Sequence, residues 1–153
     1  MKIGFIGLGL MGRPMAGHLI AAGHDVFLNR VKPASQHLVD AGGTALDTAR
    51  AVAEASDVII LMLPDTPDVE AVLFGADGVA EGAAPGKLII DMSSISPGAT
   101  KAFAARLAES GASYVDAPVS GGEVGAKAAS LTIMCYRSTG SIFCSAYDWT
   151  LVR

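Results

Sequence analysis

Three glycines near the start of the chain have a spacing that could hold a phosphate group. Gly7, Gly9 and Gly12 form a G-x-G-x-x-G pattern directly after a short apolar run at 2–6. In a strand–turn–helix unit the first glycine permits a tight turn, the second lets a pyrophosphate reach the backbone, and the third allows close helix packing. The helix N-terminus adds free N–H groups and a partial positive charge. A turn that merely packs is the alternative. The residues expected to bind a dinucleotide are Gly7, Gly9, Leu10, Met11 and Gly12.

The residues that follow the second predicted strand bear on the choice of dinucleotide. A site that prefers NAD has Asp or Glu there, which accepts hydrogen bonds from the ribose 2′-hydroxyl. This chain has Asn29 and Arg30, with Lys32 close behind. Arg30 can bind a 2′-phosphate through its planar guanidinium group, whereas an acidic side chain would repel that phosphate. We therefore expect Asn29 and Arg30 to contact NADP rather than NAD. The alternative for Arg30 is a solvated loop charge.

The elements that must position these residues alternate between strands and helices. Strands are predicted at 2–6, 25–29, 58–63, 87–91 and 114–115, and helices at 11–22, 33–42, 48–55, 68–74 and 96–110. Strands separated by helices indicate βαβ units and a parallel sheet. The apolar runs are continuous, as in strands covered on both faces. The predicted fold class is α/β: a doubly wound, mostly parallel Rossmann sheet with helices on both faces.

Composition narrows the classes of protein to which the chain could belong. Its 153 residues predict one domain, and 51% apolar with 17% charged residues argues against intrinsic disorder. The net charge of −4 argues against a nucleic-acid partner. The densest apolar run, of six residues, is too short for a membrane helix, which needs about 20. Two cysteines make no disulfide framework. We expect a cytoplasmic protein without membrane or metal partners.

Three longer segments carry a family resemblance. They are FIGLGLMGRPMA at Phe5–Ala16, DMSSISP at Asp91–Pro97 and DAPVSGG at Asp116–Gly122. In this order and spacing they resemble the 3-hydroxyisobutyrate dehydrogenase (β-hydroxyacid dehydrogenase) family. The segment LPDTP at Leu63–Pro67 is especially similar to the branch that reduces 2-hydroxy-3-oxopropionate (tartronate semialdehyde). The resemblance covers residues 1–134 and implies that they form an NADP-binding Rossmann domain.

The resemblance implies further site residues at the carboxyl ends of strands, where open α/β sheets bind ligands. The implied cofactor residues are Leu63, Pro64 and Ser94. Ser94 could instead simply begin a helix. The implied substrate loop consists of Ser120, Gly121 and Gly122. A hydroxyl group and unobstructed backbone N–H groups suit a small carboxylate, although the same residues could form a bare turn.

The reaction implied by the resemblance is hydride transfer from NADPH to the aldehyde carbon of a small 3-oxo acid, giving a hydroxy acid such as D-glycerate. In the family the proton donor is a lysine in a second, all-helical domain, followed one turn later by an asparagine. None of the five lysines here matches that motif: Lys2, Lys32, Lys87, Lys101 and Lys127. We therefore expect no catalytic residue, and Lys127 is interpreted as a solvated helix charge. The histidines are expected to be structural or exposed.

Two functions remain open at this stage: an NADPH-dependent reductase, and an NADP-binding module without turnover. The sequence predicts that the helical domain of the family is absent. Because that domain also builds the family's homo-oligomers, oligomerisation is not carried over to this chain.

The composition changes where the resemblance ends. Residues 135–153 hold both cysteines, the only tryptophan, two of the three tyrosines and only one of the 26 alanines. We expect 135–153 to be a divergent tail, which a frameshift or a genuinely different C-terminus would explain.

Overall fold

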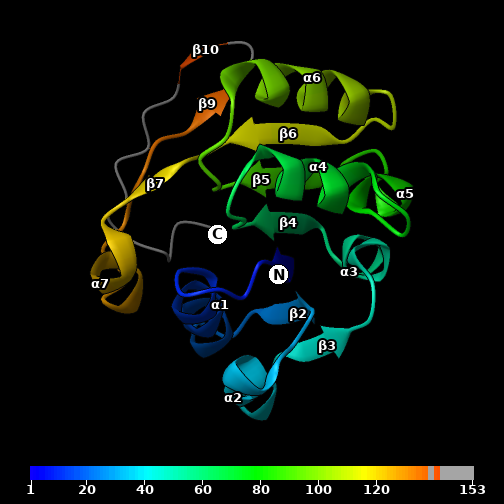
Figure 1. The fold of residues 1–153 in the computed structure, drawn as a ribbon. Helices are drawn as coiled ribbons and strands as arrows, with labels where there is room; N and C mark the ends of the chain where they lie inside the picture. The colour runs from blue at the N-terminus through cyan, green and yellow to red at the C-terminus, as the bar shows by residue number, and fades with distance from the viewer. Residues whose placement is uncertain (138–139, 142–153) are drawn as a thin grey trace.

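A computed structural model describes residues 1–137 and 140–141, which are built around an eight-stranded sheet (Figure 1). Six strands run parallel in the order β6-β5-β4-β1-β2-β3. Their bounds are β1 (Lys2–Ile6), β2 (Asp25–Asn29), β3 (Thr44–Leu46), β4 (Val58–Leu61), β5 (Leu88–Asp91) and β6 (Ser113–Asp116). Beyond β6 the sheet continues antiparallel with β9 (Tyr136–Arg137) and β10 (Gly140–Ser141). A separate antiparallel pair joins β7 (Val119–Ser120) to β8 (Thr132–Ile133).

Helices cover both faces of the sheet and enclose two hydrophobic cores. The first core involves α1 (Gly12–Ala21), α2 (Gln36–Asp40) and α7 (Gly122–Lys127), with the 3-10 turn Pro33–Ser35 before α2. The second involves α3 (Ala49–Ala55), α4 (Thr66–Phe74), α5 (Val79–Gly82) and α6 (Pro97–Ala108).

Strand β1 contributes to both cores because neighbouring side chains of a strand point to opposite faces. Phe5 is fully buried in the first core with Met15, and Ile6 is buried in the second with Val52. The predicted doubly wound sheet is therefore confirmed.

The strand order places a switch point between β1 and β4. From β1 the chain proceeds outward through β2 and β3, then returns to pair β4 with the other side of β1. Connections that leave neighbouring strands in opposite directions open a crevice at the carboxyl ends of those strands. The glycine turn after β1 and the segment after β4 both lie at this edge.

Several predicted element bounds were wrong. Strand β4 ends at Leu61 rather than Leu63, because the Leu63 N–H donates to the Ser93 side chain (2.9 Å) instead of continuing the ladder. Helix α4 begins at Thr66 rather than Asp68, since the Asp65 carboxylate accepts from the Thr66 N–H (2.7 Å) as an N-cap.

Among the elements up to β6, two short ones were missed entirely, namely β3 and α5. Neither has the apolar period that a sequence pattern needs, because β3 has three residues and α5 has four. The strand predicted at 114–115 is not the last one, since β7, β8, β9 and β10 follow it.

No helix in the described part of the chain is both long and apolar enough to span a membrane. The prediction of a divergent tail falls partly on residues 138–139 and 142–153, which lie outside the described residues.

Candidate functional site

The three glycines of the turn after β1 meet very different surroundings. Gly7 has φ +106°, and a side chain there would overlap the carbonyl oxygen of Met62. A side chain at Gly12 would overlap the carbonyl oxygen of Gly7. By contrast, a Cβ atom at Gly9 would have no heavy atom within 4 Å. Packing therefore requires the first and third glycines, while the second leaves its backbone open to a group approaching from outside, as a bound pyrophosphate needs.

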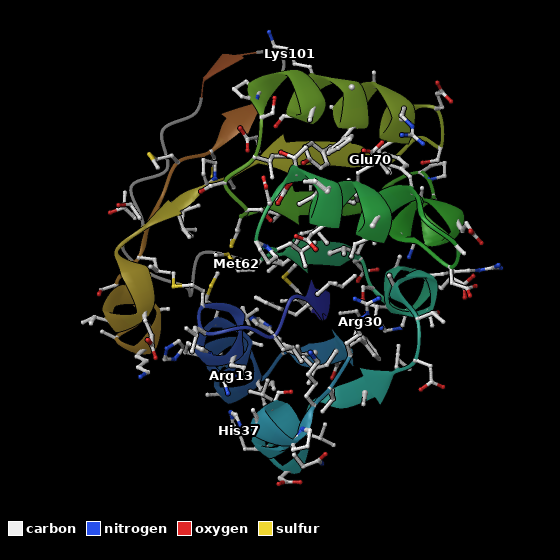
Figure 2. The ribbon with its side chains drawn as sticks, in the orientation of Figure 1. Arg13, Arg30, His37, Met62, Glu70 and Lys101 are labelled. Atoms are coloured by element: carbon white, nitrogen blue, oxygen red, sulfur yellow. The ribbon has the colours of Figure 1, made fainter. Side chains whose placement is uncertain are left out.

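The N-terminus of α1 has no acidic residue of its own. Its cap residue Met11 makes no side-chain hydrogen bond to the helix, and the first turn contains no acidic residue. The Arg13 guanidinium donates to the carbonyls of Gly9 (3.3 Å) and Ala34 (3.2 Å), so it lies between α1 and the segment before α2 (Figure 2). Leu10 is 62% exposed beside the turn. An anion at this helix end would meet the positive end of the helix dipole.

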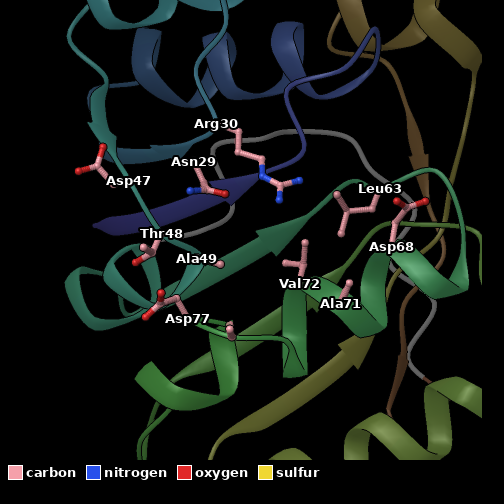
Figure 3. A pocket seen from close by; sticks show the side chains of 12 residues that line it. Asn29, Arg30, Asp47, Thr48, Ala49, Leu63, Asp68, Ala71, Val72 and Asp77 are labelled. Carbon is pink, nitrogen blue, oxygen red and sulfur yellow. The ribbon is translucent and has the colours of Figure 1, made fainter.

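A pocket of about 260 Å³ lies beside the end of β2 (Figure 3). Four parts of the chain form its walls: the end of β2, helix α4, the segment that joins β3 to α3, and the loop that joins α4 to α5. The lining residues are Asn29, Arg30, Asp47, Thr48, Ala49, Leu63, Asp68, Ala71, Val72, Ala76, Asp77 and Gly78. The pocket therefore brings together three residues predicted from the sequence, Asn29, Arg30 and Leu63, with others that were not.

Charge in this pocket is mixed. Arg30 is the one cation among the lining residues just named, and three lining residues are acidic: Asp47, Asp68 and Asp77. Arg30 has φ +53°, an uncommon backbone conformation for a residue other than glycine. Figure 3 shows its guanidinium group extending toward the side where Leu63 lies. A phosphate would pair with Arg30, whereas hydroxyl or amino groups would suit the carboxylates.

The buried Asn29 supports this pocket. It is 4% exposed, and its amide donates to the Leu46 carbonyl (3.3 Å) at the end of β3. This bond holds the ends of β2 and β3 together. The side-chain oxygen of Asn29 remains an acceptor on the pocket side.

The other predicted site residues lie outside this pocket. Pro64 and Ser94 are exposed beyond the carboxyl ends of β4 and β5. Ser120, Gly121 and Gly122 are exposed where β7 leads into α7, and the two glycines have φ of +131° and +59°. Positive φ explains why glycines occupy these two positions.

A single histidine links the predicted substrate loop to the glycine turn. His18 of α1 contacts the carbonyls of Ala126 (3.0 Å) and Lys127 (3.2 Å) in α7 through Nε2. Two carbonyl acceptors at one ring nitrogen mean that this nitrogen carries the proton. His18 thus has a structural role, and it attaches the helix that follows 120–122 to the helix that follows the glycine turn.

Two lysines make contacts with other groups of the protein. Lys127 is 66% exposed and pairs with Glu123 (2.8 Å), and this hydrogen bond lowers the pKa of the Glu123 carboxyl. Lys87 donates to the carbonyls of Ala53, Glu54 and Ser56 at 2.7, 3.1 and 2.6 Å.

Sequence reasoning missed a buried polar cluster at the ends of β5 and β6. Asp91 is fully buried and accepts hydrogen bonds from the Tyr114 hydroxyl (2.6 Å) and the Ser93 N–H (2.9 Å). Asp116 pairs in register with Asp91 on the neighbouring strand. Burial, together with repulsion from Asp91, raises the pKa of Asp116 above its ordinary value. The available signal was a carboxylate that ends an apolar strand and is followed two residues later by serine.

Residues 2–140 match the family model described as the NAD binding domain of 6-phosphogluconate dehydrogenase. The 2-hydroxy-3-oxopropionate reductase of Escherichia coli strain K12 is 53% identical over 134 residues, which are 88% of this chain and 46% of that enzyme. The chain thus spans about half the length of the curated relatives it matches.

Solved structures of related proteins are also similar to this chain. The 3-hydroxyisobutyrate dehydrogenase of Mycobacterium tuberculosis, solved with L-serine, has a TM-score of 0.79 and 36% identity over 87% of this chain and 45% of its own. Psf3, solved in complex with NADP+ and 2-OPP, has a TM-score of 0.81 and 30% identity over 87% of this chain and 48% of its own. These likenesses confirm the family resemblance and the fold class predicted from the sequence.

The steric difference within the glycine turn predicts different effects on stability for the same substitution at two positions. Gly12→Ala should lower the free energy of unfolding by about 1–3 kcal/mol, because the new methyl group overlaps the Gly7 carbonyl and the helix must shift. Gly9→Ala is the matched control and should leave stability nearly unchanged. Urea unfolding of both variants measures the difference, and equal losses would contradict this account.

The raised pKa of Asp116 predicts a pH-dependent gain in stability for Asp116→Asn. A carboxyl whose pKa is raised in the folded state favours folding while protonated, and this contribution is lost as the pH rises through the raised value. At pH 7 the ionised wild-type side chain therefore opposes folding, and asparagine should increase the free energy of unfolding. The gain should disappear below the ordinary pKa of 3.8. Urea unfolding at pH 7 and pH 3 measures it, and an equal gain at both would indicate a packing effect instead.

Proposed function

Because this chain belongs to the family of NAD-binding domains of the 6-phosphogluconate dehydrogenase type, we propose that it binds NADPH. The reaction that we propose is the reduction of a small 3-oxo acid. The observation that carries this proposal is the glycine turn at the sheet's switch point. There Gly7 and Gly12 are packed against backbone and Gly9 is open. The similarity to 2-hydroxy-3-oxopropionate reductase supports tartronate semialdehyde as the substrate and D-glycerate as the product.

The residues at the glycine turn fit the phosphates of the cofactor. Backbone N–H groups around Gly9, Leu10 and Met11 would donate to the pyrophosphate, with the positive end of the α1 dipole behind them. Arg13 would hold the turn in shape through its bonds to the carbonyls of Gly9 and Ala34.

The pocket beside β2 fits the adenosine half of the cofactor. Ala49, Leu63 and Val72 would provide apolar contacts to the adenine ring. Arg30 would pair with a 2′-phosphate, which supports NADP, and the known NADP+ complex of Psf3 agrees. The nearby carboxylates would accept hydrogen bonds from ribose hydroxyl groups, which is the interaction that a site for NAD uses.

The other end of the cofactor would lie along the carboxyl ends of β4 and β5. Pro64 and Ser94 are exposed there, and Ser94 would contact the nicotinamide ribose or the substrate. The nicotinamide supplies the hydride when bound. Ser120, Gly121 and Gly122 would hold the carboxylate of the substrate through a hydroxyl and open backbone N–H groups.

A second function is a dinucleotide-binding module without turnover. The contacts of two lysines favour this function. Lys87 donates hydrogen bonds to three backbone carbonyls, and Lys127 forms a solvent-exposed ion pair with Glu123. Neither of these two lysines is then available to give a proton to a developing alkoxide.

The role of Arg30 predicts a change in cofactor preference. Arg30→Ala should weaken NADPH binding roughly tenfold or more, the value of a charge-assisted hydrogen bond, while leaving NADH binding within about twofold. Titration calorimetry with both cofactors gives the ratio of dissociation constants. An unchanged ratio would show that Arg30 is a solvated loop charge.

A folded variant that cannot bind either cofactor is the control for that titration. Gly9→Val places a branched side chain into the open space over the turn, where the pyrophosphate is expected, so both affinities should fall together. If Gly9→Val bound NADPH as well as the wild-type chain does, the proposed phosphate site would be wrong.

Turnover separates the two functions. For these 153 residues by themselves we expect NADPH to bind without being oxidised in the presence of tartronate semialdehyde, because none of their lysines matches the family's donor. Loss of nicotinamide absorbance is the measurement. Oxidation above the rate without protein would identify a donor within this chain, and Lys127→Ala would then test the nearest candidate.

A further inference from the structure

A buried chain of hydrogen bonds joins three strands beneath the candidate cofactor site. It begins at the Tyr114 hydroxyl on β6, which donates to the Asp91 carboxylate at the end of β5 (2.6 Å). The same carboxylate accepts from the Ser93 N–H (2.9 Å). The Ser93 hydroxyl oxygen then accepts from the N–H of Leu63, beyond the end of β4 (2.9 Å). Side chains therefore connect the segment after β4 to the segment after β5 where the sheet's own ladder has ended.

Burial makes these bonds strong constraints. Asp91 and Ser93 are both 0% exposed, whereas their partners Leu63 and Tyr114 are half-buried, so the side-chain oxygens of Asp91 and Ser93 depend on protein partners. A buried donor or acceptor without a partner costs about 1–3 kcal/mol, and a charged one costs more. The backbone positions of Leu63 and Ser93 are thus tied to each other and, through Asp91, to β6.

The two segments held in this way carry residues of the proposed site. The Leu63 side chain lines the pocket that also contains Arg30. Ser94, the next residue after Ser93, is exposed at the carboxyl end of β5. The bond between Ser93 and Leu63 lies directly between these two parts of the cofactor surface.

We propose that Ser93 and Asp91 are positioning residues, which hold the segments after β4 and β5 at the separation that NADPH requires. This inference rests on the proposed function. Neither residue is expected to touch the cofactor, because both are fully buried. They act through Leu63 and Ser94, which are preorganised before the ligand arrives.

Ser56 provides a matched control at the opposite end of β4. It is also buried, at 1% exposure, and its hydroxyl makes a bond to a backbone group, the Val52 carbonyl (2.7 Å). Ser93→Ala and Ser56→Ala therefore each remove one buried bond between a side chain and the backbone. If the role of a serine is structural only, its replacement by alanine should lower stability and leave cofactor binding unchanged.

The experiment measures NADPH and NADH dissociation constants together with urea unfolding for the wild-type chain and both variants. Ser93→Ala should raise the dissociation constants roughly three- to tenfold, while Ser56→Ala should leave them unchanged despite a comparable loss of stability. Amide hydrogen exchange at Leu63 should become faster in Ser93→Ala only, with or without the cofactor.

Each outcome has a separate meaning. Unchanged dissociation constants in Ser93→Ala, with normal binding by the wild-type chain, overturn the positioning role alone. Absence of binding by the wild-type chain overturns the proposed function, and the positioning role with it. If Ser93→Ala does not fold, Tyr114→Phe removes one hydroxyl from the same chain of bonds. It should weaken NADPH binding in the same direction, and unchanged binding would again overturn the inference.

Discussion

The contact between Gly12 and the carbonyl oxygen of Gly7 is the constraint on which the rest of this structure depends. No side chain fits between them, so α1 begins directly against the turn that leaves β1. This contact directs the start of α1 toward the carboxyl edge of the sheet. It also brings Met15 and Leu19 onto Phe5 and Ile3 in the first core. The turn proposed to bind phosphate and a packed core thus both depend on one close approach of backbone to backbone.

The same edge of the sheet gathers groups that are far apart in the sequence. Arg30 follows β2, Leu63 follows β4 and Ser94 follows β5, and parallel strands end together on one side. Their relative positions are not left to the sheet alone. Asn29 ties β2 to β3, and Ser93 ties the end of β5 to the segment after β4. Beyond the ends of the backbone ladders, side-chain hydrogen bonds therefore fix the positions of these segments.

Charged groups lie in three regions of the site. Near the glycine turn, the first turn of α1 contains Arg13 and no acidic residue. Beside β2, Arg30 shares its pocket with three carboxylates, so a phosphate and a set of hydroxyl groups would be bound by different side chains. At the ends of β5 and β6, burial of Asp116 and repulsion from Asp91 raise the pKa of Asp116. Asp91 is fully buried and Asp116 is half-buried, so this cluster affects the geometry of the site more than the charge that a ligand meets.

Local patterns in the sequence determined the fold class, the glycine turn and the strands that flank it, because each depends on neighbours within a few residues. The apolar runs at 25–29 and 87–91 and the spacing of Gly7, Gly9 and Gly12 are of this kind. Only the tertiary structure decided which residues share the pocket, since Asp47 precedes α3, Asp68 lies in α4 and Asp77 lies in the loop between α4 and α5. It also decided where β4 ends, because the partner of the Leu63 N–H is a serine 30 residues away. A short-range pattern cannot contain a bond that exists only after the strands have assembled.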